Sequence, residues 1–212
     1  MADNYLENRC EDIQNGSKHK TTIKINNPSL NSLVLKNRSY RAYDASNIVS
    51  KDKLLDILSV CNKIPSARNA QVLRYRLVTA DESNKVLANI RLGGGLPELK
   101  LPLPGTEPNA YLIICAIEEG KWTDMDLGIA AQTILLKAVE KGLGGICIGA
   151  FDKKAIIEQF RLPYEPKLIL AIGKPAEKIQ LKNISATESH AYYRKDDIHY
   201  VPKIKLEDLI ID

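Results

Sequence analysis

The stretch TDMDLGIAAQTILLKAVEKGLGGICIGAF, residues 123–151, contains the longest helix that the sequence predicts. Apolar residues fill most positions between 124 and 141 with little polar interruption, which is typical of a buried helix. Thr123 and Asp126 stand three residues apart and predict a capping box at its start. Because this helix is apolar around most of its circumference, other elements must cover it on both sides.

Strands and helices alternate along the rest of the chain. The Gly- and Pro-rich residues 93–109 predict a long irregular crossing, of the kind that often forms a lid or binding segment. Strands are expected at residues 72–78, 110–117, 146–151 and 167–175, and further helices at 31–36, 51–64, 81–92 and 152–162. In the helix that Ser50 caps and Pro65 ends, the shared apolar face is expected to carry Leu54, Leu55, Leu58 and Cys61.

The composition fits one globular domain. The chain has 212 residues, of which 44% are hydrophobic, enough for a substantial core. Residues 1–28 are polar and predict an N-terminal arm, which leaves 29–212 as the domain. The tail, residues 176–212, reads as a long extended segment after the last clear strand, yet it is too apolar for disorder. We expect it to wrap around a partner subunit, since homodimers are the commonest closed assembly.

The charge balance argues against a nucleic-acid partner. Thirty basic and 26 acidic side chains give a net charge of +4, which indicates a surface of mixed sign. No apolar run approaches the length that spans a bilayer, and the polar N-terminal residues contain no apolar signal segment. We therefore expect a cytoplasmic protein without a membrane partner.

The cysteines and histidines do not predict a metal site. The cysteines lie far apart without a CxxC pair, and the three histidines do not combine with them at zinc-ligand spacing. We expect free thiols, with Cys61, Cys115 and Cys147 in the core and Cys10 in the arm.

Four separate segments contain candidate binding motifs: NRSYRAY at 37–43, PSARNAQ at 65–71, GLGGICIGAFD at 142–152 and YVPKIKLEDL at 200–209. In their order and spacing they resemble the FMN-dependent nitroreductase family, over residues 30–210. The resemblance implies an α+β fold with a mixed central sheet flanked by helices. It also implies an intertwined homodimer whose C-terminal extension crosses to the partner.

The first and last segments suit an anionic cofactor. FMN ends in a dianionic phosphate, which needs fixed cations and hydrogen-bond donors. The resemblance places Arg41 at the pyrimidine edge of the flavin, where a cation stabilises the negative charge of the reduced ring. It assigns the phosphate and ribityl end to Arg38 and Ser39, with Lys203 and Lys205 as a C-terminal phosphate clamp. Asn37 is a further expected cofactor contact, at a position where the family more often has Arg or His. The alternative is a solvated helix end followed by solvent-facing tail lysines.

The loop PSARNAQ is implied to come from the opposite subunit and to close on the flavin. Its expected cofactor contacts are Pro65, Ser66, Ala67, Asn69 and Gln71. Arg68 falls where the family presents a residue to the substrate, and an arginine there favours acidic substrates or the phosphate of a nicotinamide cofactor. A proline turn with a surface arginine is the simpler alternative.

The glycine-containing strand is implied to line the flavin ring. The resemblance places the backbone N–H of Gly149 or Ala150 against flavin N5, with Cys147 and Ile148 beside the ring. A backbone donor favours hydride arrival at N5 without adding a titrating group. No histidine partners Cys147 in the sequence, so core packing explains this cysteine better than a catalytic thiol does.

The sequence departs from the family pattern between residues 118 and 124, where larger members insert helices. The lid is then expected from residues 93–109, or the cleft is open, and Trp122 is either a cleft wall or an interface anchor. Lys100 and Asn109 are candidates for the pyrimidine-facing contacts. The function implied is two-electron transfer by a ping-pong mechanism from NADH or NADPH through flavin N5 to a nitroaromatic, quinone or flavin. A flavin-binding sensor or storage protein with little turnover is the alternative.

Overall fold

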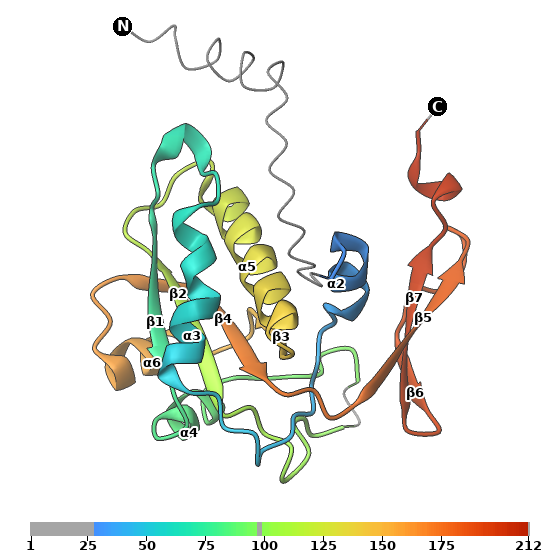
Figure 1. The fold of residues 1–212 in the computed structure, drawn as a ribbon, viewed down its shortest axis with the longest axis horizontal. Coiled ribbons are helices and arrows are strands. Elements are labelled where there is room, and N and C mark those ends of the chain that lie inside the picture. Colours follow the sequence, from blue (N-terminus) through green and yellow to red (C-terminus); the bar gives the residue numbers. More distant parts are fainter. Residues whose placement is uncertain (1–27, 97–98, 212) are drawn as a thin grey trace, which may run out of the picture.

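The computed structural model describes residues 28–96 and 99–211, so the predicted arm lies outside the described residues apart from Pro28. Figure 1 shows a sheet with helices on both of its faces and a second, smaller sheet beside α2. The helices are α2 (Leu30–Lys36), α3 (Lys51–Leu58), α4 (Ser83–Leu87), α5 (Thr123–Glu140) and α6 (Lys153–Phe160). The strands of the main sheet are β1 (Leu73–Val78), β2 (Ala110–Ala116), β3 (Gly144–Ile148) and β4 (Glu165–Gly173).

The main sheet has the strand order β1-β2-β4-β3, and each of its three pairings is antiparallel. The expectation of a mixed central sheet is therefore wrong for this chain. Alternate residues of β2 face opposite sides of the sheet. Leu112 and Ile114 pack against α3 and α5, whereas Tyr111 and Ile113 share a core cluster with residues of α4 and α6.

Helix α5 forms as predicted, but its start differs from a capping box. Thr123 is its first residue, and the Thr123 hydroxyl accepts a hydrogen bond from Gly120 N–H at 2.9 Å. Asp126 does not return to the helix start; its carboxylate bonds to the loop 65–71. One face of α5 packs on the sheet, and Met125, which is 55% exposed, lies on a face that no described element covers.

Helix α3 begins at the predicted cap, where Ser50 Oγ accepts a hydrogen bond from Lys53 N–H at 3.2 Å. The α-helix ends at Leu58 and continues as a 3-10 helix over Ser59–Asn62, several residues before Pro65. Leu54 and Ile57 are fully buried, whereas Leu55 is 48% exposed. The buried face is therefore rotated from the predicted one, and Leu55 lies at its edge.

Other boundaries were set by tertiary contacts. The helix expected over 81–92 is only α4, because its last residues join an isolated bridge between Ile90 and Phe151. The described residues of 93–109 contain no helix or strand, as predicted. Cys115 is buried, but Cys61 is only partly buried and Cys147 is exposed, so the prediction of three core cysteines holds for Cys115 alone.

The tail is more regular than expected. It forms a three-stranded sheet in the order β5-β7-β6, from β5 (Lys178–Ile184), β6 (Tyr193–Lys195) and β7 (Ile198–Ile204), followed by a 3-10 helix over Glu207–Leu209. Strand β5 runs parallel to β7 and β6 antiparallel to it. The sequence pattern hid these strands because they are only partly buried and carry few consecutive apolar residues. In the described part of the chain, no helix combines the length and the apolar character that a membrane span requires.

Candidate functional site

The segment 37–43 lies along the free edge of β3. Ser39 forms a parallel bridge with Gly145, and Tyr40 N–H donates to the Gly145 carbonyl at 3.2 Å. A Cβ on Gly145 would stand 2.4 Å from the Ala171 carbonyl oxygen, so only glycine allows this close packing. The first and third sequence motifs, about a hundred residues apart, are thereby joined side by side.

A basic pocket opens where this segment meets the tail sheet. Its volume is about 250 Å³. The lining residues are Asn37, Arg38, Ser39, Arg41, Ile179, Tyr192, His199, Val201 and Lys203. Three of them are cations and none is a carboxylate. The pocket therefore suits an anion, and it brings together three of the four residues predicted for the phosphate end, with Arg41 and Asn37.

Lys205 is the predicted phosphate ligand that this pocket does not include. Its backbone N–H donates to the Ile184 carbonyl at 3.0 Å, and its side chain is exposed. Lys205 directly follows strand β7. Lys203, the other lysine predicted to bind the phosphate, lies within β7 and lines the pocket.

Each of the two arginines of the pocket donates to a backbone carbonyl and retains further N–H donors. Arg38 Nη2 donates to Val34 O at 2.8 Å, and Arg41 Nη1 donates to Ser39 O at 2.9 Å. Arg41 is only 8% exposed, and its guanidinium carbon lies 4.9 Å from the centre of the Tyr192 ring. The Nε atoms of both arginines are buried without a hydrogen-bond partner among the described residues. Unpaired buried donors are costly, so an acceptor in the pocket would stabilise both.

Glu177 holds the tail against this segment, and sequence reasoning missed it. Its carboxylate accepts hydrogen bonds from the backbone N–H groups of Arg41 and Ala42, the latter at 3.2 Å, and it forms an ion pair with Arg194. The Glu177 side chain is 5% exposed. A single acid in a charged tail carries no sequence signal, because only the fold brings it to residues 41 and 42.

His199 was also missed, and it lies deep in the same pocket. It is 2% exposed and pairs across the tail sheet with Arg194. Its Nε2 lies 3.5 Å from Arg41 Nη1, and its Nδ1 has no partner in the described structure. Burial, with the nearby charges of Arg41 and Arg194, lowers the pKa of His199 to about 4. The ring is therefore neutral at pH 7.

The loop 65–71 is held in an unusual backbone conformation. Arg68, Asn69 and Gln71 have φ angles of 53°, 53° and 51°, in the left-handed region. Asp126 Oδ1 accepts from Ala67 N–H at 2.9 Å, and Ser66 Oγ accepts from Gln71 N–H at 3.1 Å. These two bonds fix both ends of the loop. Asp126 therefore positions the loop 65–71, a role that the predicted capping box did not include.

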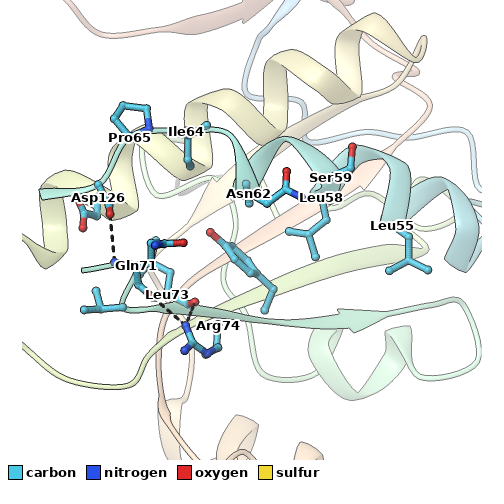
Figure 2. A pocket seen from close by; sticks show the side chains of 14 residues that line it. Leu55, Leu58, Ser59, Asn62, Ile64, Pro65, Gln71, Leu73, Arg74 and Asp126 are labelled. Carbon is cyan, nitrogen blue, oxygen red and sulfur yellow. Dashed lines mark hydrogen bonds between the residues drawn. The ribbon is translucent and has the colours of Figure 1, made fainter. Parts of the chain in front are cut away.

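Two cavities flank this loop. The larger, about 410 Å³, lies between α3 and β1, and Figure 2 shows Leu55 and Leu58 on its helix side with Leu73 and Arg74 on its strand side. The predicted cofactor contacts Pro65, Ser66 and Gln71 line it. On the other side of the loop, Ala67 and Arg68 line a cavity of about 310 Å³ with Lys121 and Trp122. Asn69 lines neither cavity, and its side-chain oxygen accepts a hydrogen bond from the Gln71 side chain at 3.1 Å.

The residues after β3 line a fourth cavity. Gly149 and Ala150 are exposed at a cavity of about 540 Å³, opposite Asn89 and Arg91. Cys147 is exposed, and partial desolvation raises the pKa of its thiol. Ile148 is 2% exposed and belongs to the core, so its side chain does not line this surface. Within one chain, the predicted cofactor residues that line a cavity are thus divided among four cavities, and Asn69, Cys147, Ile148 and Lys205 line none of these four.

The candidates for pyrimidine-facing contacts have other surroundings. The Asn109 side chain accepts from Val49 N–H at 3.1 Å and donates to the Asn47 carbonyl at 3.0 Å, so it fixes a neighbouring loop. Lys100 is exposed. Among the described residues, no group of three or more His, Cys, Asp or Glu side chains is arranged to hold a metal ion.

Comparison with known proteins gives a consistent result. The family model described as "Nitroreductase family" matches residues 95–174. YodC of Bacillus subtilis (strain 168), provisionally named an NAD(P)H nitroreductase, is 25% identical over 71% of this chain and 92% of its own length.

Solved structures agree with the family model. An FMN-dependent nitroreductase from Clostridium difficile R20291 is 26% identical, with a TM-score of 0.54 over 69% of this chain and 87% of its own. A protein from Exiguobacterium sibiricum 255-15, provisionally named a nitroreductase and solved in complex with FMN, shares the fold with a TM-score of 0.58 at 19% identity, over 71% of this chain and 90% of its own. The family model, the curated relative and these structures thus agree in showing that the chain is similar to proteins of the nitroreductase family.

Proposed function

We propose that this protein is an FMN-dependent oxidoreductase that uses NADH or NADPH and works as a homodimer. The observation that carries the proposal is the basic pocket, in which Arg38, Arg41 and Lys203 converge beside Ser39. The names of the C. difficile and E. sibiricum proteins, which specify FMN, support the same cofactor.

The pocket fits a phosphate monoester on physical grounds. A phosphate brings about two negative charges at pH 7 and three acceptor oxygens. The buried Nε atoms of Arg38 and Arg41 lack acceptors within the described chain, and no carboxylate lines the pocket to compete for them. Charge-assisted hydrogen bonds of this kind are roughly twice as strong as neutral ones. Arg38, Ser39 and Lys203 would hold the phosphate.

Bound FMN would supply the redox chemistry, taking two electrons from NAD(P)H by a ping-pong mechanism and passing them to a nitroaromatic, quinone or flavin acceptor. The chain contributes binding and electrostatics. Arg41 would hold positive charge near the cofactor from a buried position, where a charge is screened less than in water. The backbone N–H groups of Gly149 and Ala150 would orient the ring.

A second copy of the chain would complete each site. The loop 65–71 and the strand end at Gly149 line separate cavities in one chain. Apolar side chains stay exposed on three helices, including Leu35 on α2, Leu55 on α3 and Met125 on α5. A dimer that buries these helices would bring the partner's loop to the flavin and cover apolar surface at the same time.

The acceptor site is proposed at the loop. Arg68 lines a cavity with Lys121 and Trp122, and the Lys121 ammonium lies 4.8 Å from the centre of the Trp122 ring. Two acids, Glu118 and Asp126, line the same cavity, so the aromatic wall rather than a net charge favours planar acceptors, and Arg68 offers a cation to an acidic group on them.

Spectroscopy tests the proposal directly. Purified protein should be yellow, with the absorption spectrum of FMN. Anaerobic NADH or NADPH should bleach it, and menadione or a nitroaromatic should restore the colour. Colour that persists with both nucleotides would favour the sensor or storage function. A colourless protein that FMN cannot reconstitute would overturn both.

A further inference from the structure

The imidazole of His199 lines the basic pocket, but the proposed cofactor contacts give it no role. Like Lys203 it comes from the tail, and it faces the same pocket as Arg38 and Ser39. At 2% exposure it is the most deeply buried ionisable group there, since Arg41 is 8% exposed.

Arg41 determines which nitrogen of this ring carries the proton. A guanidinium has only donors, so the 3.5 Å approach of Arg41 Nη1 to His199 Nε2 favours the tautomer in which Nε2 is the acceptor. In the neutral ring the single proton is then on Nδ1. Nδ1 is buried and has no partner within the described residues, so this N–H is a buried donor without an acceptor.

None of the other described groups around the ring accepts that bond. Arg194 is the cross-strand neighbour of His199; its guanidinium has only donors and forms an ion pair with Glu177. Tyr192 lies with its ring centre 5.2 Å from that of His199, tilted by 58°, and its hydroxyl accepts from Gly95 N–H at 2.9 Å. The positive charges of Arg38, Arg41 and Lys203 on the pocket wall would attract an anionic acceptor.

We propose that His199 is a phosphate-binding residue, which donates its Nδ1–H to an oxygen of the phosphate monoester while Arg41 holds the opposite nitrogen. The proposal rests on the proposed function for the identity of the ligand as FMN. A neutral donor adds a bond without adding charge. The ring thereby distinguishes a phosphorylated flavin from one that lacks the phosphate.

Paired ligands and variants test this role. Kd is measured for FMN and for riboflavin, which lacks the phosphate, at pH 7 by fluorescence quenching. His199→Leu removes the donor and should weaken FMN binding about 10- to 100-fold, the equivalent of a hydrogen bond to a charged group, while riboflavin changes less than about twofold. His199→Asn keeps a side-chain N–H and should recover most of the difference. His190→Leu changes an exposed histidine outside the pocket and should leave both Kd values unchanged.

Equal losses for FMN and riboflavin would show a purely structural role and overturn the proposal, as would an unchanged FMN Kd. Nitrogen NMR of the wild-type ring gives a second readout that needs no variant to fold. The neutral ring should carry its proton on Nδ1, and the Nδ1 resonance should shift with FMN but not with riboflavin. An Nε2–H ring would contradict the geometry. If one of these results contradicts the role of His199 but the wild-type protein still binds FMN, the proposed function stays intact. A wild-type protein that binds neither flavin would overturn both proposals.

Discussion

Asp126 shows how one side chain can position a loop far from it in sequence. Its carboxylate is 4% exposed and accepts from Ala67 N–H. We predict that Asp126→Ala leaves this N–H unpaired and lowers the free energy of unfolding by about 1–3 kcal/mol. Urea denaturation measures the loss, and hydrogen exchange at Ala67 should accelerate. Asp124→Ala, an exposed acid in the same helical turn, is the control and should cost less than about 1 kcal/mol.

His199 gives the cofactor-free protein a predictable response to pH. Its folded pKa of about 4 lies below the ordinary 6.5, so the unfolded chain binds more protons between these values. Stability conferred by the neutral ring is complete above pH 6.5 and decreases as the pH falls toward 4, by an amount on the order of 3 kcal/mol.

Urea midpoints at pH 7 and pH 4.5 measure this decrease. His199→Asn should show a smaller pH dependence than the wild type, and His190→Asn should retain it. A wild-type profile in His199→Asn would mean that other groups govern the acid response.

At the scale of elements, two glycines on adjoining elements should respond oppositely to the same substitution. A methyl group on Gly145 of β3 would meet the Ala171 carbonyl at 2.4 Å and Leu135 at 2.6 Å. Gly145→Ala should therefore destabilise the fold by about 1–3 kcal/mol and loosen the bridge to Ser39. On α5, a methyl group on Gly128 meets nothing within 4 Å, so Gly128→Ala should stabilise the fold by about 0.5–1 kcal/mol. Thermal unfolding compares the two, and the same sign for both would contradict this packing.

At the scale of the whole molecule, shared sites predict complementation between two inactive variants. Arg38→Glu reverses a charge in the basic pocket, and Asn69→Asp alters the loop while tolerating its left-handed backbone. After subunit exchange in an equal mixture, half of the dimers are mixed and each has one intact site. About one quarter of the wild-type activity should return, because the closed symmetry gives two sites per dimer. No recovery after verified exchange would show that each site lies within one chain.

Local patterns in the sequence predicted the elements that depend on nearby residues. The Ser50 cap, the buried strand β2 and the apolar helix α5 follow from spacing along the chain, and the structure confirms each. The sequence also predicts an anion site at residues 37–41, since all five of these side chains offer charge or hydrogen bonds, and this role stays a prediction. The loop motif was recognisable from its order of residues.

The tertiary structure decided which groups face each other. The antiparallel pairing of the main sheet, the small tail sheet and the bond from Asp126 to Ala67 all join segments with no local signal. Glu177 and His199 approach residues 41–42 only because strands β5 and β7 fold back beside them. The sequence by itself determined the periodic elements and the chemistry available in each motif, because propensity and charge are local properties. Only the folded chain determined the partners of each buried donor and acceptor, because hydrogen bonds and burial depend on distances that sequence spacing does not fix.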